Sequence, residues 1–292
     1  MRTRLPLIAV LLVALGLTAG AARAILGGQP DGTAHPYVGL ENNGVFTCSG
    51  TLLSPTVMLT AAHCFSDSTS AFGTAPDGAP IVRVSFDPDL AHTAPADRVW
   101  HFGLYYFDPQ FALGTKGGLP GFDTHDVALI IFGTDGCSVP ANVTGHSSCG
   151  PVSSPSYGQL PASGLVDTLK NKTPIDIVGY GVQDFLKGGG PCGGPCKPTD
   201  GDSLTRFVGQ TTLVAANDRI SDEFIKERGN NAGTCFGDSG GPNLLGGTST
   251  VLAVTSFGTS PFCKGNGYSY RVDTPAALDW ITTTASDKGG HL

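Results

Sequence analysis

The apolar stretches of this chain are short, and turn-forming residues separate them. The sequence holds 42 Gly and 21 Pro in 292 residues, and the stretches between them are rich in Val, Ile, Leu, Thr and Phe. Many short β-prone segments divided by turns predict an all-β protein with antiparallel sheets, and not a fold of alternating strands and helices. Six such segments lie at residues 37–40, 57–60, 81–84, 127–132, 175–178 and 251–257.

One helix is predicted close to the end of the chain, at about residues 274–285. Asp273 or Thr274 can cap its N-terminus, and Pro275 suits its first turn. The residues after it, 287–292, are expected to form a loose tail. Polar segments rich in Gly and Pro predict surface insertions at residues 115–121, 135–163 and 187–202.

The first 24 residues have the pattern of an export signal. Arg2 and Arg4 form a basic start, and residues 5–17 are apolar. Ala22 and Ala24 are the small residues that signal peptidase prefers at −3 and −1. The apolar run is shorter than the roughly 20 residues that span a bilayer. We therefore expect a secreted, extracellular and soluble protein.

The mature protein is predicted to be acidic. The whole chain holds 17 Lys and Arg against 24 Asp and Glu, a net charge of −7. The first 24 residues carry three Arg and no acid, so the remaining 268 residues have a net charge of −10. This balance argues against nucleic acid or an anionic membrane as a partner. The length suits one large β domain or two barrels, and we expect a monomer without a cofactor.

All eight cysteines follow the export signal. An even number in an exported chain predicts disulfide bonds. Cys192 and Cys196 form a close pair that a metal site would also need. Zinc sites usually have a second Cys or His pair at matching spacing, and none is apparent, so no metal site is predicted.

Ser239 lies in a run of small residues, Gly237-Asp238-Ser239-Gly240-Gly241-Pro242. A serine hydroxyl is a poor nucleophile near neutral pH, so a hydrolase needs a general base beside it and donors for the oxyanion that forms. The glycines let the backbone turn sharply and let the amides of Gly237 and Ser239 point at one spot. A surface turn is the competing interpretation, because Gly-rich turns are common in such a chain.

Two motifs upstream supply the partners that such a serine needs. His63 lies in Thr60-Ala61-Ala62-His63-Cys64, and an imidazole with a pKa of about 6.5 can accept and return a proton near neutrality. Asp126 begins an apolar strand, where a buried carboxylate needs a partner such as an imidazole N–H. Either residue alone would more often be structural.

In the order His63, Asp126, Ser239, these motifs resemble those of the trypsin/chymotrypsin family. The resemblance extends from Ile25 to about residue 281. Further segments are similar to family signatures, the last two with an aromatic residue in place of the usual Trp: Ile25-Leu26-Gly27-Gly28, Thr47-Cys48-Ser49-Gly50, Gly179-Tyr180-Gly181 and Ser256-Phe257-Gly258.

The resemblance implies a peptidase domain at residues 25–286, built from two antiparallel six-stranded Greek-key barrels at about 25–150 and 164–273. The active site would lie in the cleft between them. It also implies a secreted serine endopeptidase that acts on protein or peptide substrates. Ser239 would attack the scissile carbonyl, His63 would transfer the proton, and Asp126 would fix the His tautomer.

The resemblance also places further site residues. Gly237 and Ser239 would form the oxyanion hole, and Ser256 matches the family serine that bonds the catalytic Asp. The pocket for the P1 side chain, which precedes the scissile bond, would have Gly233 at its floor where trypsins carry Asp. Because an uncharged floor would leave a substrate Lys or Arg unpaired, we predict an apolar or aromatic P1 side chain, with a small one as the alternative. The remaining pocket residues would be Thr234, Phe257, Gly258 and Gly267.

In the family, a free N-terminal ammonium pairs with the Asp that precedes the nucleophile, which here implies an ion pair between Ile25 and Asp238. Ala24 precedes Ile25 in place of the usual Lys or Arg. Since residues 22–24 also form a signal-peptidase site, our hypothesis is that export alone exposes Ile25.

Family positions imply the disulfides Cys48–Cys64 and Cys235–Cys263. The other four cysteines allow three pairings, among which proximity in the sequence favours Cys137–Cys149 and Cys192–Cys196.

Two other interpretations compete with an active peptidase of this family. The run at 237–241 also fits the G-x-S-x-G pattern of α/β-hydrolases, but their chain order would require Asp273 and His291. Their serine should also open a helix, whereas Pro242, Gly246 and Gly247 follow Ser239 here. The stronger competitor is a catalytically silent family member that acts as a secreted binding protein.

Overall fold

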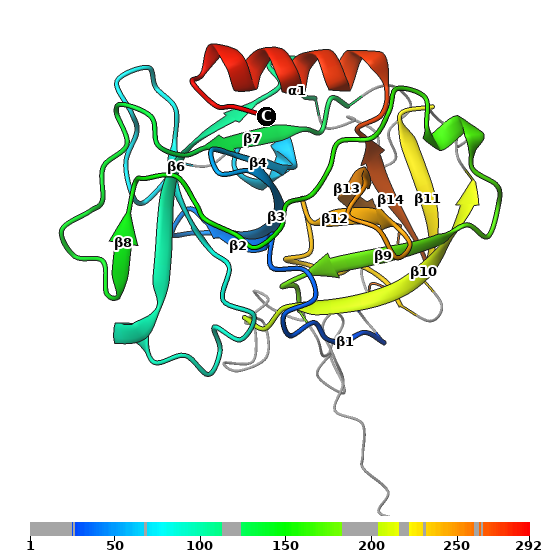
Figure 1. Cartoon of the computed structure of the whole chain (residues 1–292), viewed down its shortest axis with the longest axis horizontal. Helices are drawn as coiled ribbons and strands as arrows, with labels where there is room; N and C mark the ends of the chain where they lie inside the picture. The colour runs from blue at the N-terminus through cyan, green and yellow to red at the C-terminus, as the bar shows by residue number, and fades with distance from the viewer. Residues whose placement is uncertain are drawn as a thin grey trace, which may run out of the picture.

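A computed structural model describes residues 25, 27–66, 69–112, 124–182, 204–215, 222–229, 232–259, 263 and 265–292. Within this part of the chain, strands form two closed barrels and one α-helix follows them (Figure 1). The prediction of an all-β fold is confirmed. Other predicted features lie outside the described residues: the export signal at 1–24, the insertions at 115–121 and 187–202, and the pair Cys192 and Cys196.

The first barrel closes through six antiparallel strands in the order β5-β2-β3-β4-β7-β6, with β6 returning to β5. Its central strands are apolar on both faces, and β4 and β7 are buried along their whole length. The strands are β2 (Val38–Asn42), β3 (Thr47–Ser54), β4 (Val57–Thr60), β5 (Ile81–Ser85), β6 (Val99–Phe107) and β7 (Ala128–Ile131), and β8 (His146–Ser148) runs parallel to β6. Two short 3-10 helices lie in the connections, η1 (Ala62–Cys64) and η2 (Pro95–Asp97).

The second barrel closes in the order β10-β11-β14-β13-β12-β9, with β9 returning to β10. Strand β1 (Gln29–Pro30) pairs with β10, so residues 29–30 belong to this barrel. The boundary expected at residue 25 had assigned them to the first barrel. The other strands are β9 (Pro174–Gly179), β10 (Phe207–Ala215), β11 (Phe224–Gly229), β12 (Pro242–Leu245), β13 (Val251–Gly258) and β14 (Gly265–Arg271), and η3 (Val166–Thr168) precedes β9.

Helix α1 (Pro275–Asp287) lies across the top of both barrels (Figure 1). The Thr274 hydroxyl caps it by accepting the amide of Ala277 at 3.2 Å. The expectation of a loose tail was wrong. The helix continues to Asp287, and the amide of His291 donates to Thr56 Oγ1 of the first barrel at 2.8 Å. The chain end therefore ties the helix to the first barrel.

Arg206 joins the two barrels through a buried guanidinium. Its Nε pairs with Asp31 at 2.7 Å, and its Nη1 donates to the carbonyl of Val38 at 2.9 Å and to that of Phe86 at 3.1 Å. The side chain is 1% exposed. A charge buried this deeply is tolerated only when its donors are satisfied, so these contacts fix how the barrels face each other.

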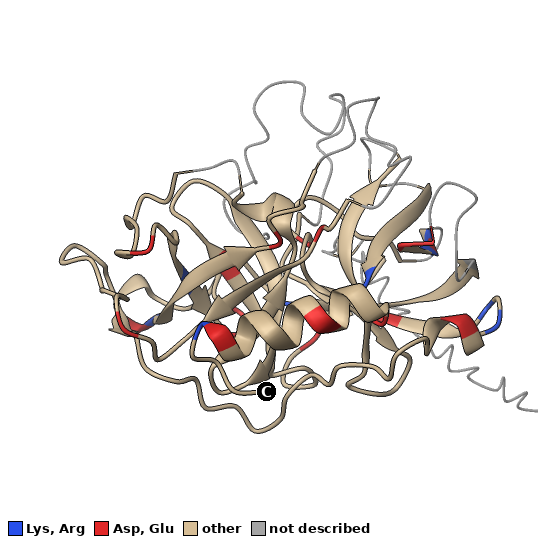
Figure 2. Cartoon of the chain, turned by 90° about the horizontal axis from the view of Figure 1, so that it is seen from above, with Lys and Arg blue, Asp and Glu red and all other residues tan. Residues whose placement is uncertain are grey.

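Charged residues are few and are spread over both barrels and the helix (Figure 2). Among the described residues, no helix is long and apolar enough to cross a membrane.

Candidate active site

Asp126 and His63 form a direct pair. His63 Nδ1 lies 2.8 Å from Asp126 Oδ2, and the backbone amide of His63 donates to Oδ1 at 2.9 Å. The hydroxyl of Ser256 also donates to Oδ2. Asp126 is 1% exposed, while the imidazole of His63 is about one-fifth exposed. The carboxylate is thus held by three donors, and it fixes the orientation of a ring that is partly open to solvent.

The electrostatics of the pair favour its charged form. Burial raises the pKa of Asp126, but the nearby His63 and the hydrogen bonds outweigh it, so the pKa lies below its usual value. Burial lowers the pKa of His63, but the charge of Asp126 and the hydrogen bond raise it, so the pKa lies above its usual value. The ring is therefore a stronger base than free imidazole.

Local structure explains how the two side chains come together. His125 has a φ of +47°, in the left-handed region, and the amide of Val127 donates back to its carbonyl at 2.8 Å, which turns the chain at Asp126. On the other side, the buried hydroxyl of Tyr105 lies 2.8 Å from the carbonyl oxygens of both Ala61 and Ala62, at the start of η1. The backbone before His63 is thereby fixed to the first barrel.

The loop that carries Ser239 is fixed against β3 and lies close to β4, the strand leading to His63. The amide of Ser49 donates to the carbonyl of Ser239 at 2.8 Å. Gly240 has a φ of +75°, and a Cβ there would collide with Thr60 Oγ1. No hydrogen bond joins His63 to Ser239 within the described residues. Such contacts are often long before substrate binds.

The two peptide groups beside the predicted oxyanion hole are both anchored. The amide of Val182 donates to the carbonyl of Phe236 at 2.8 Å, and Ser49 Oγ donates to the carbonyl of Gly237 at 2.8 Å. Ser49 Oγ in turn accepts the amide of Tyr180 at 2.9 Å. Because the N–H of Gly237 lies trans to the carbonyl of Phe236, the first bond turns this N–H away from Val182.

Asp238 is fully buried between the two glycines of the segment 179–181. Its Oδ1 accepts the amide of Gly181 at 2.8 Å, and its Oδ2 accepts the amide of Cys235 at 2.9 Å. Burial raises the pKa of Asp238 to about 7, and the two amides oppose this shift without cancelling it. No cation among the described residues lowers this pKa.

The side chain of Ile25 is buried in the second barrel. It packs with Ile177 and Ala232, and its Cγ2 would lie 2.5 Å from a Cβ on Gly209. In the full chain its nitrogen is a peptide amide, because Ala24 precedes it. The structure thus holds Ile25 and Asp238 in the same barrel, each buried, without an ion pair between them.

A small pocket, with a volume of about 10 Å³, lies beside the Ser239 loop. Four of the predicted pocket residues line it: Gly233, Thr234, Gly258 and Gly267. Phe257 lies outside this lining and stacks on Tyr268, with the ring centroids 4.9 Å apart. Ser256 lies at an irregularity in the pairing of β13 with β14, and its hydroxyl is directed to Asp126.

Three of the four expected disulfides are present in the described residues: Cys48–Cys64, Cys137–Cys149 and Cys235–Cys263. The first joins η1, which contains His63, to β3, and the third joins the Ser239 loop to Cys263 at the pocket wall. One cluster in this part of the chain has metal-ligand spacing: Glu41, Cys48 and Cys64. Its two sulfurs are bonded to each other and are not available as thiolate ligands.

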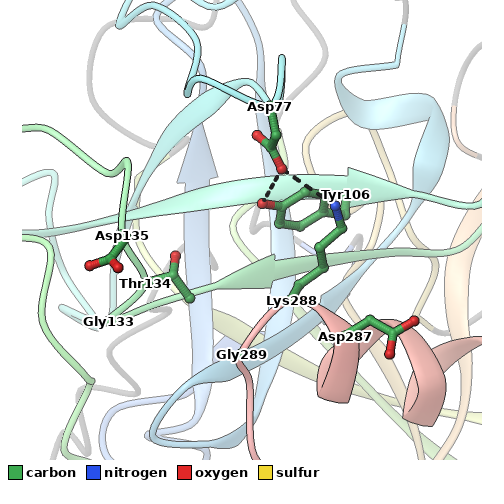
Figure 3. Close-up of a pocket in the computed structure, with 8 residues that line it drawn as sticks. All are labelled: Asp77, Tyr106, Gly133, Thr134, Asp135, Asp287, Lys288 and Gly289. Carbon is green, nitrogen blue, oxygen red and sulfur yellow. Dashed lines mark hydrogen bonds and ion pairs between the residues drawn. The ribbon is translucent and has the colours of Figure 1, made fainter.

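A second, open pocket lies where α1 meets the first barrel (Figure 3). Asp77 Oδ2 accepts the Tyr106 hydroxyl at 3.0 Å and lies 3.4 Å from Lys288 Nζ. Asp77 and Lys288 thus form an ion pair at a solvent-exposed position. The pocket contains none of the predicted site residues.

The chain belongs to the trypsin family, because its sequence matches the Trypsin family profile over residues 25–281. Kallikrein-1E2 of the horse (Equus caballus) is 26% identical over 275 residues, which cover 90% of each protein. Two solved structures share the fold at low identity. HL collagenase is 19% identical with a TM-score of 0.59 and covers 90% of this chain and 99% of its own. Human heparin-binding protein is 18% identical with a TM-score of 0.58 and covers 92% of this chain and 100% of its own.

Proposed function

We propose that the protein is a secreted serine endopeptidase with Ser239 as nucleophile, His63 as general base and Asp126 as the residue that orients His63. The observation that carries this proposal is the carboxylate of Asp126, which is buried and holds His63 at both its amide and its Nδ1. With Nδ1–H donated to Asp126, the Nε2 of His63 is left as the acceptor that a general base requires.

The proposed reaction proceeds in two acyl-transfer steps. Ser239 Oγ attacks the scissile carbonyl while His63 takes its proton, and the amides of Gly237 and Ser239 stabilise the oxyanion. His63 then returns the proton to the leaving amine, which leaves an acyl-enzyme. A water molecule, activated by the same imidazole, hydrolyses this ester and restores Ser239. The end of β13 at Ser256–Gly258 would pair with the substrate backbone as an added strand.

The P1 preference predicted from Gly233, apolar or aromatic, stays a prediction. It rests on the absence of a carboxylate at that one position.

The proposal is tested by labelling the correctly processed protein with a serine-reactive organophosphate. The adduct is expected on Ser239, located by peptide mass spectrometry, and Ser239→Ala serves as the control that should take up no label. Protein that starts at Ile25 but is not labelled would refute a catalytic Ser239.

A silent binding protein is the alternative function. One structural neighbour is named a heparin-binding protein. The excess of Asp and Glu over Lys and Arg in this chain disfavours a polyanionic ligand. The labelling experiment separates the two functions, since only an assembled nucleophile reacts.

Ser49→Ala is expected to lower kcat about tenfold with little change in KM. The substitution removes the hydrogen bond to the carbonyl of Gly237, which positions the oxyanion hole, and leaves the buried amide of Tyr180 without its acceptor. Steady-state kinetics on one peptide substrate measure the change. Ser49→Thr, which keeps a hydroxyl, is the comparison variant, and an unchanged kcat in Ser49→Ala would contradict the positioning role.

A further inference from the structure

A buried carboxylate lies beside Gly267, one of the residues that line the predicted P1 pocket. Glu227 on β11 is paired directly with Gly267 on β14. A Cβ on Gly267 would therefore point to the same face of the sheet as the side chain of Glu227. A Cβ on Gly267 would lie 2.7 Å from Glu227 Oε1. Since Gly267 lines the pocket together with Gly233, the carboxylate occupies the space that a side chain at residue 267 would take.

The hydrogen bonds of this carboxylate are incomplete. Its Oε1 accepts the hydroxyl of Ser269 at 2.7 Å, while its Oε2 is buried without a partner among the described residues. Ser269 Oγ accepts the amide group of Asn243 at 2.9 Å, and Asn243 Oδ1 is also buried and unpartnered. Behind the residues that line the pocket there are therefore two buried acceptors that lack donors, and a donor-only group such as an ammonium or guanidinium would complement them.

No charged group in the described structure compensates Glu227. On its own strand, Lys226 and Arg228 alternate to the opposite face, and Lys226 Nζ lies 5.3 Å from the ring centre of Tyr268. On β14, Arg271 is paired with Asp273 and Asp167. The facing strand β10 places Leu213 opposite Glu227, and neither β10 nor β13 carries a titratable side chain.

The carboxyl group of Glu227 is therefore mostly neutral below about pH 7 and ionises above it. Burial raises the pKa of Glu227 to about 7, against smaller opposing effects of the Ser269 hydrogen bond and of the backbone amide of Glu227 itself. A carboxyl group of this kind destabilises the fold when it ionises. Strongly shifted carboxyl groups beside a pocket are typical of functional sites.

We propose that Glu227 is a specificity-determining residue of the P1 pocket and that its ionised form binds the cationic end of a substrate Lys or Arg. This proposal rests on the proposed peptidase function. The free Oε2 would accept an N–H of the substrate cation, in place of the Asp that trypsins carry at the position of Gly233. In the neutral form the same pocket lacks a charge, and the apolar preference predicted from Gly233 applies to that form.

The test uses three peptide substrates that differ only in P1, which is Lys, Arg or Phe. We measure kcat/KM for each from pH 5 to pH 9 and take the ratios of Lys to Phe and of Arg to Phe. Ionisation of His63 and Asp238 affects all three substrates alike, so it cancels in these ratios. At least one ratio is expected to rise by up to about tenfold per pH unit through pH 7, following the ionisation of Glu227.

Glu227→Gln, of nearly equal size, is expected to lower the Lys and Arg ratios about 100-fold at pH 8 and to remove their pH dependence. Glu41→Gln is the matched control. Glu41 is also buried with a raised pKa, but it lies in the first barrel and accepts from Thr60, so its substitution should leave the ratios and their pH dependence unchanged.

Ratios that do not change with pH in the wild type, or a Glu227→Gln variant that retains them, would overturn the proposal. Organophosphate labelling of Ser239 in each variant shows that the active site is assembled. If no substrate is cleaved and Ser239 is not labelled, the peptidase function itself fails. If Phe substrates are cleaved but Lys and Arg substrates are not, only the role of Glu227 fails.

Discussion

Asp126→Asn is expected to lower kcat by about 10⁴-fold. The carboxylate of Asp126 accepts both the amide and the Nδ1–H of His63, and an asparagine that donates to Nδ1 would stabilise the wrong tautomer of the ring. The acid limb of the kcat/KM profile should also move to lower pH, because the charge of Asp126 raises the pKa of His63. Steady-state kinetics between pH 5 and pH 9 measure both effects.

The chain offers a matched control for this substitution. Asp108 is also buried and lies 3.2 Å from the Nδ1 of His125, the residue next to Asp126. Asp108→Asn therefore removes a similar Asp–His contact beside the site, and kcat should stay within a few-fold of the wild type. A kcat in Asp126→Asn within tenfold of the wild type would exclude the proposed role of the pair.

Retention of residues 22–24 before Ile25 is expected to lower kcat/KM by roughly 10²–10³-fold. A free ammonium at Ile25 would pair with Asp238, whose carboxylate is otherwise buried with a pKa raised to about 7. Removing one partner of a buried ion pair costs about 3–5 kcal/mol, and here that loss should disorder the adjoining oxyanion loop. Kinetics of two preparations, with starts verified by mass spectrometry, measure the effect.

The control is a chain with the same extension followed by a cleavable site, so that Ile25 can be exposed in the same sample. Activity should appear when the extension is removed. An extended chain that is fully active before cleavage would show that Ser239 does not depend on a free Ile25. It would also remove the reason to expect Ile25 as the N-terminus of the exported protein.

The motifs predicted from the sequence are local, and that explains which predictions succeeded. The confirmed prediction is the all-β fold, which rests on apolar segments divided by turn residues. The runs around His63 and Ser239 also lie within a few consecutive residues each, and their catalytic roles stay predictions. The prediction of a loose tail was wrong because it concerned a contact between distant parts of the chain. The packing of His291 depends on Thr56, which is 235 positions away in the chain, and no local pattern reports such a contact.

Glu227 and Ser49 were missed because their roles depend on pairing between distant strands. In the segment 224–229, Lys226, Glu227 and Arg228 are consecutive charged residues, and the sequence alone does not indicate which one faces the barrel. The register with β14, which places Glu227 opposite Gly267, decides it. A one-residue shift would expose Glu227 and bury its neighbours.

The buried Arg206 has a consequence for how long such a protein would survive its own activity. A peptidase is attacked by other copies of itself mainly through segments that open transiently. Separating the barrels would strip this guanidinium of the carbonyls of Val38 and Phe86, which belong to the first barrel, and would leave it paired only on its own side. Because that loss makes separation rare, self-digestion should begin in surface loops, and the half-life of the protein in concentrated solution should depend on those loops and not on the opening of its cleft.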